Sequence, residues 1–97
     1  MERFGASRFS SVARVLADEA RRCGLAAPGF RSPPRLPGAL RTIRRAGDCS
    51  VVAIRLAGRP PAEVITDMVE GVVVANRLAG DRAARARDAL LEAVDVA

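Results

Sequence analysis

The first periodic run of apolar residues begins at Phe9 and recurs every three to four positions. Its members are Phe9, Val12, Leu16, Ala20 and Cys23. This spacing places them on one face of a helix. Ser7 or Ser10 can cap the start of that helix, and Gly24 can adopt the left-handed conformation that ends it. The pattern predicts a helix that ends at Gly24, preceded by a flexible arm of residues 1–8, which show no periodicity.

The helical pattern stops in residues 25–38, which are rich in proline and glycine. The residues concerned are Pro28, Gly29, Pro33, Pro34, Pro37 and Gly38. Proline lacks a backbone donor, so this segment excludes a helix and disfavours a central strand. We expect a stiff, extended connector that carries Arg31 and Arg35. An edge strand around Phe30 is compatible with it.

A change to a period of two predicts a β-hairpin with strands at residues 40–45 and 49–56. The second run alternates between two sets, Val52, Ile54 and Leu56 against Val51, Ala53 and Arg55. The strands are separated by Ala46, Gly47 and Asp48, and a two-residue turn at Gly47 and Asp48 would pair Ile43 with Val52 on the buried face. The open face would then carry Thr42, Arg44, Ala53 and Arg55, with Arg41 and Arg45 at its margins.

A second helix is predicted to begin at the pair Pro60 and Pro61, since proline suits the first turn of a helix. Its apolar positions cover most of the circumference and are Val64, Ile65, Met68, Val69, Val72, Val73 and Leu78. Its polar stripe is Glu63, Asp67, Glu70 and Arg77. Residues 72–77 also have strand propensity, and Gly71 could end a shorter helix before them. The periodicity favours a helix through this region.

A last helix follows Gly80, which is expected to end the preceding one. Asp81 can cap its start, and its apolar side consists of Ala83, Ala86, Leu90 and Val94. The order is therefore an N-terminal helix, a β-hairpin with room for an extra edge strand, and two C-terminal helices. We predict a single small α+β domain over residues 9–97, because a chain of 97 residues has no material for a second core.

The composition leaves little material for catalysis. The chain has no His, Lys or Tyr, so a Ser or Cys nucleophile would lack a base matched to neutral pH. Cys23 and Cys49 show neither the spacing of metal ligands nor that of a redox pair, and a disulfide between them has no support in the sequence. We expect no enzyme activity, no cofactor and no metal, and we expect reduced thiols.

One row of carboxylates, Glu63, Asp67 and Glu70, lies at helical spacing i, i+4 and i+7. Such a row could hold a divalent cation through oxygen ligands. More commonly it is the solvated face of an amphipathic helix. The second interpretation is favoured.

Neither a signal peptide nor a membrane span is predicted. Residues 1–30 contain eight charged side chains and no apolar stretch of the kind that a signal peptide needs. The longest apolar run, residues 72–75, is far shorter than the ~20 residues of a membrane helix. The expected location is the cytoplasm.

All sixteen basic residues are arginines, and seven of them lie in residues 31–59. That stretch has one acid, Asp48, and a net charge of +6, whereas residues 60–97 have a net charge of −3. The candidate residues for binding a polyanion, in particular the backbone of duplex nucleic acid, are Arg31, Arg35, Arg41, Arg44, Arg45, Arg55 and Arg59. Only Phe30 in this stretch could stack on bases, which favours duplex over single strands. The alternative is that these arginines pair with the C-terminal acids, within the chain or across a dimer.

The second helix is apolar over too wide an arc for two strands to cover it. Small residues at four-residue steps, Gly71, Ala75 and Ala79, would also permit close approach of another helix. These features predict a homodimer whose interface comprises Val64, Met68, Gly71, Val72 and Ala75. The alternative is that the first and third helices wrap the second helix within one chain. The alternative function is that of an adaptor, in which the apolar and acidic C-terminal helices dock a protein partner.

Overall fold

The computed structural model describes residues 4–32, 42–46, 49–56 and 58–96, with the backbone alone for residues 42–46 and 49–50. Within these ranges the elements are α1 (Ala6–Arg22), β1 (Gly29–Arg31), β2 (Thr42–Ala46), β3 (Cys49–Ala53), α2 (Pro61–Ala75) and α3 (Gly80–Val96). The predicted α+β class is confirmed, with an N-terminal helix, a hairpin, the extra edge strand and two C-terminal helices. None of the described helices is long and apolar enough to cross a membrane.

The three strands form one mixed sheet in the order β1-β3-β2. The hairpin strands β2 and β3 are antiparallel, and Ile43 lies opposite Val52, as the turn length predicts. On the other side of β3, β1 runs parallel to it and places Phe30 opposite Val52. Strand β3 ends at Ala53, earlier than predicted, although the Ile54 amide still donates to the Arg31 carbonyl at 2.9 Å.

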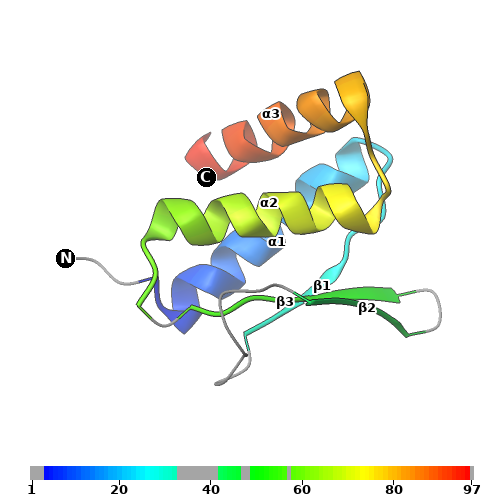
Figure 1. The fold of residues 1–97 in the computed structure, drawn as a ribbon. Coiled ribbons are helices and arrows are strands. Elements are labelled where there is room, and N and C mark those ends of the chain that lie inside the picture. Colours follow the sequence, from blue (N-terminus) through cyan, green and yellow to red (C-terminus); the bar gives the residue numbers. More distant parts are fainter. Residues whose placement is uncertain (1–3, 33–41, 47–48, 57, 97) are drawn as a thin grey trace.

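The helices lie on one side of the sheet (Figure 1). Helices α1 and α2 run beside each other over the sheet, and α3 packs on both of them at the greatest distance from the strands. The largest fully buried side chains come from all three layers and are Leu16, Ile54, Met68, Leu90, Val52, Val64, Val69 and Val72. No described helix covers the other face of the sheet, which is called the open face below.

Helix α1 ends as predicted and begins earlier than predicted. Gly24 adopts a φ of +74°, and the following amide, that of Leu25, donates to the Ala20 carbonyl at 2.8 Å, which closes the helix. At the other end, Gly5 is the N-cap residue and no side chain caps the helix. Phe4 is only 3% exposed and packs edge-to-face on Phe9, with 6.5 Å between ring centroids. Phe4, within the predicted arm, is therefore packed on the core, and α1 starts at Ala6.

Helix α2 includes residues 72–75, so the helical interpretation of this region is confirmed over the strand. The helix ends at Ala75 rather than at Gly80 because Arg77 adopts the left-handed conformation, with a φ of +54°, and Leu78 donates to the Val73 carbonyl at 3.1 Å. Gly80 instead begins α3.

The reason for this early end is the side chain of Asn76, which binds the connector between α1 and β1. Its amide nitrogen donates to the carbonyls of Ala26 and Val72, both at 2.9 Å, and its amide oxygen accepts from the Ala26 backbone at 2.8 Å. These bonds hold the connector against the end of α2, fifty positions later in the chain.

Candidate nucleic-acid interface

The open face of the sheet is set by the alternation of side chains along β1 and β3. Val52 is fully buried against the helices, whereas its neighbours Val51 and Ala53 are partly exposed on the opposite face. Phe30 packs toward the helices as well, so Arg31 belongs to the open face and is exposed. Across the hairpin, the register places Arg44 opposite Val51. The open face therefore has one arginine position on each of its edge strands.

Arg31 is the best defined of the predicted binding residues. Its carbonyl is held by the Ile54 amide, which fixes the backbone of β1 at this point. The described part of the chain offers its guanidinium neither a hydrogen bond nor an ion pair. An exposed arginine without an internal counter-charge on a fixed strand is suited to bind an external anion.

Arg44 and Arg45 both lie in β2, the edge strand on the other side of β3. Arg44 is opposite Val51, and Arg45 is opposite Ser50, one position along and therefore on the other face of the sheet. Since adjacent strands are about 4.8 Å apart, the backbones of β1 and β2 are separated by roughly 10 Å. Arg35 and Arg41, also predicted to bind, lie outside the described residues.

Arg55 follows directly after β3 and is half-buried. Its Nε atom is buried and has no hydrogen-bond partner, and its carbonyl accepts from Arg59 Nη1 at 3.1 Å. This guanidinium is thus partly withdrawn into the protein, in contrast to that of Arg31.

The structure places Arg59 in the interior, away from the open face. Arg59 is only 7% exposed, and its guanidinium donates to Glu63 at 2.7 and 2.9 Å and to Asp67 at 2.6 Å. Burial lowers the pKa of Arg59, but the hydrogen bonds to Asp67 and Glu63 outweigh this effect and raise it above its ordinary value. Arg59 ties the residues before α2 to the first turns of that helix. The spacing of Arg59, Glu63 and Asp67 at four-residue steps is the signal by which the sequence could have revealed this cluster.

The carboxylate row Glu63, Asp67 and Glu70, which could have held a cation, is bound by arginines instead. Glu63 and Asp67 hold Arg59, and Glu70 accepts from Arg87 of α3 at 2.5 and 3.0 Å. The hydrogen bonds to Glu70 raise the pKa of Arg87. Among the described residues, no group of three or more acidic, Cys or His side chains is placed to hold a metal ion. Of the seven predicted binding residues, Arg59 thus pairs with C-terminal acids, as the alternative interpretation expects, while Arg31 has no such pair among the described residues.

Four of the five residues predicted to form a subunit interface are buried within the protein. Val64, Met68 and Val72 are fully buried, Gly71 is buried against β3, and Ala75 is partly exposed. They are covered because α3 packs along α2 and α1 packs beside it, which completes the enclosure that two strands could not provide. In this conformation the four buried residues offer no surface to a second copy.

Cys23 is not positioned as a nucleophile. It lies exposed at the end of α1 as a free thiol, and its sulfur donates to Glu19 at 3.6 Å. Desolvation, followed by the hydrogen bond to Glu19 and the charge of that carboxylate, raises the pKa of the Cys23 thiol. The reactive thiolate is therefore disfavoured at neutral pH. The side chain of Cys49 is outside the described part of the structure.

Comparison of the chain with protein-family models, with curated proteins and with solved structures gives no match.

Proposed function

We propose that this protein binds a polyanion, specifically the backbone of duplex nucleic acid, through the open face of its sheet and the arginine-rich segments at the sheet edges. The observation that carries the proposal is the position of Arg31, exposed on a sheet face that no described helix covers. Arg44 belongs to the same face on the other edge strand, where it is opposite Val51, two positions before Ala53, the partner of Arg31. Several arginines on one surface neutralise several phosphates at once, and the release of counterions then drives binding.

The arrangement of charge supports this proposal. The acids Glu63, Asp67 and Glu70 are engaged by Arg59 and Arg87 on the helical side of the sheet. Among the residues with described side chains, Arg31 makes no ion pair with these carboxylates, so its charge is available to an anion at the open face.

The aromatic residues favour duplex over single-stranded nucleic acid. Phe30, the aromatic residue in the basic stretch, packs edge-to-face on Phe9 with 6.4 Å between centroids. Phe4 packs on Phe9 as well and has the guanidinium of Arg8 5.4 Å from its ring centre. All three phenylalanines of the chain are thus occupied within the fold, and none is free to stack on an unpaired base. Backbone contacts of this kind position a duplex with little readout of its sequence.

The test is a salt titration of binding to a fluorescent DNA duplex, repeated with an RNA duplex. For the parent protein, log affinity should fall linearly with log salt, with a slope near −0.9 for each phosphate contacted. The Arg31→Ala and Arg44→Ala double variant should flatten that slope by about two units.

The matched control is the Arg14→Ala and Arg82→Ala double variant, which removes the same charge from exposed positions on α1 and α3. It should leave the slope close to that of the parent. Equal slopes for the two double variants, or no binding by the parent at low salt, would refute the proposal.

A further inference from the structure

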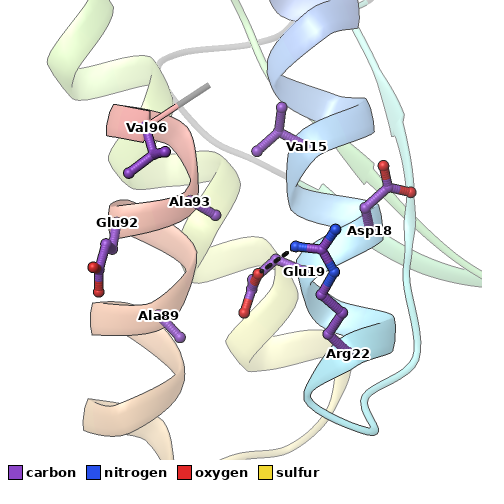
Figure 2. Close-up of a pocket in the computed structure, with 8 residues that line it drawn as sticks. All are labelled: Val15, Asp18, Glu19, Arg22, Ala89, Glu92, Ala93 and Val96. Carbon is purple, nitrogen blue, oxygen red and sulfur yellow. Dashed lines mark ion pairs between the residues drawn. The ribbon is translucent and has the colours of Figure 1, made fainter.

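A groove of about 470 Å³ runs between α1 and α3 on the helical side of the protein (Figure 2). Its floor on α3 consists of Ala89 and Ala93, which lie one helical turn apart, and Val15 of α1 and Val96 of α3 lie at one end of it. The groove exists because the side chains of α3 on its floor are those of alanines, which are too short to fill the space beside α1. Larger side chains at these positions would fill it.

The apolar surface in this groove is incompletely covered. Val96 is 80% exposed, and Val15, Ala89 and Ala93 are only partly buried. A seam between two helices with small residues along its floor accommodates the ridge of a third helix. The shape of the groove therefore suits a helix that lies along it.

The rim of the groove is acidic. On α3, Glu92 has neither a hydrogen bond nor an ion pair within the described part of the chain, and the exposed Asp88 and Asp95 flank it along the same helix. On α1, Asp18 is paired with the exposed Arg21, at 3.3 Å. The one basic residue in the lining, Arg22, is paired with Glu19, at 3.6 Å (Figure 2). In a protein of net charge +5, the carboxylates here that have no such pair within the described part of the chain are those of Glu92 and, beside it, Asp88 and Asp95.

We propose that this groove binds one α-helix of a protein partner, with a short apolar ridge for the floor and Lys or Arg on either side for the rim. Charge complementarity selects a basic helix, because its cations meet Glu92 and the neighbouring Asp88 and Asp95. The same carboxylates repel a nucleic acid, so the groove and the open sheet face have different ligands. The lining extends from Val15 to Arg22 on α1 and from Ala89 to Val96 on α3, so the groove holds about two turns of the partner helix, roughly 12 Å.

The first experiment uses a synthetic helical peptide of Ala, Leu and Lys, with one ridge of leucines flanked by lysines. A twin peptide has Glu in place of each Lys. Titration of the isotope-labelled protein with the Lys peptide should shift the NMR amide signals of Val15, Ala89 and Ala93, and leave those of Arg31 and Val51 in place. Shifts centred on the sheet, equal binding of the Glu twin, or no binding of the Lys peptide would overturn the proposal.

The second experiment uses matched variants. Ala93→Phe fills the groove and should weaken Lys-peptide binding about tenfold or more, whereas Ala84→Phe, at an exposed α3 position outside the groove, should change it less than about twofold. Should Ala93→Phe unfold the protein, the double variant Asp88→Asn and Glu92→Gln decides. It should weaken binding roughly two- to fivefold per charge, and Asp81→Asn should not.

Sedimentation of the parent and of Ala93→Phe separates a foreign partner from a second copy. If the parent self-associates and Ala93→Phe abolishes this, the occupant is another copy of the chain and the assignment of a basic partner helix is wrong. The variants Arg31→Ala and Arg44→Ala should bind the Lys peptide like the parent, so the two proposals can fail independently.

Discussion

Gly71 of α2 lies so close to Val52 of β3 that a Cβ atom on the glycine would be 2.8 Å from Val52 Cγ1 and 3.1 Å from Cγ2. Carbon atoms in ordinary contact are roughly 3.5 to 4.0 Å apart. A glycine inside a helix costs about 1 kcal/mol relative to alanine, so its presence here is offset by the close approach of α2 to the sheet. Val52 is in the middle of the central strand, between Phe30 and Ile43, and cannot withdraw easily.

Gly71→Ala should therefore destabilise the protein, although alanine is the better helix former. We expect a net loss of about 1 to 3 kcal/mol in the free energy of unfolding, measured by urea denaturation, because the new methyl group overpacks the contact with Val52. Adding Val52→Ala should relieve part of the conflict, so the two substitutions should be non-additive. The control is Ala84→Gly at an exposed site on α3, which measures only the difference in helix propensity between alanine and glycine. A stabilisation by Gly71→Ala of the size lost in Ala84→Gly would contradict the packing argument.

Asn76→Asp should destabilise the protein by about 1 to 3 kcal/mol, because it replaces the donor to the Ala26 and Val72 carbonyls with an acceptor. The two carbonyls disfavour the charged form of the introduced carboxyl, so its pKa rises in the folded state. Stability of the variant should then fall as pH increases through that raised pKa and recover in acid. Thermal melts of the variant and parent from about pH 4 to 7 test this. A constant difference between the two proteins across that range would exclude the proposed role of the amide.

Arg59→Lys should lower the free energy of unfolding by about 1 to 3 kcal/mol while keeping the charge. Lysine has no planar fork with which to reach Glu63, Asp67 and the Arg55 carbonyl together. The control is Arg14→Lys on the exposed side of α1, which should be nearly neutral. Because Arg59 is assigned to the interior, the duplex affinity of Arg59→Lys should match that of the parent at a temperature where both are folded. A loss comparable to that of the Arg31 and Arg44 variant would place Arg59 in the interface after all.

Alkylation of Cys23 should become fast only above the ordinary thiol pKa of about 8.5, since desolvation and Glu19 raise its pKa. The rate of reaction with iodoacetamide across pH, in a Cys49→Ser background, gives the midpoint. Glu19→Gln should move this midpoint to lower pH, and Asp18→Asn, one position earlier, should move it less. A midpoint near neutral pH in the parent would identify a reactive thiol and contradict the expected inertness.

Competition with unlabelled nucleic acids should favour duplex over single strands of the same length. The reason is that Phe30, Phe9 and Phe4 are engaged with one another or with Arg8 inside the fold. Fluorescence anisotropy of a labelled duplex at fixed salt gives, for each competitor, the concentration that displaces half of the label, and the two concentrations are then compared. Stronger competition by an unpaired strand would show that base stacking contributes and that the sheet face is used differently.

The elements that the sequence alone determined are those governed by residues close together in the chain. The run from Phe9 to Ala20 forms one face of a helix because its spacing matches the helical period, and Gly24 ends it because glycine accepts a positive φ. The pairing of Ile43 with Val52 follows from the length of a turn between them. These features depend on local geometry, which the order of residues specifies.

The candidate site depended more heavily on contacts between distant residues. Only the tertiary structure decided that Arg59 is buried and does not belong to the arginine surface. The first turns of α2 place Glu63 and Asp67 beside its buried guanidinium. The tertiary structure also decided that Val64, Met68 and Val72 form the core, because α3 folds back along α2. The length and polarity of a segment cannot reveal which distant element will cover it.

The end of α2 shows both kinds of determination at one place. The helical period through residues 72–75 could be predicted from the sequence, and the stop at Ala75 could not. At that stop Asn76 binds Ala26, fifty positions earlier in the chain, and Arg77 adopts a left-handed conformation. Local sequence sets what each segment can form, and long-range contacts set where it ends and which of its side chains reach solvent.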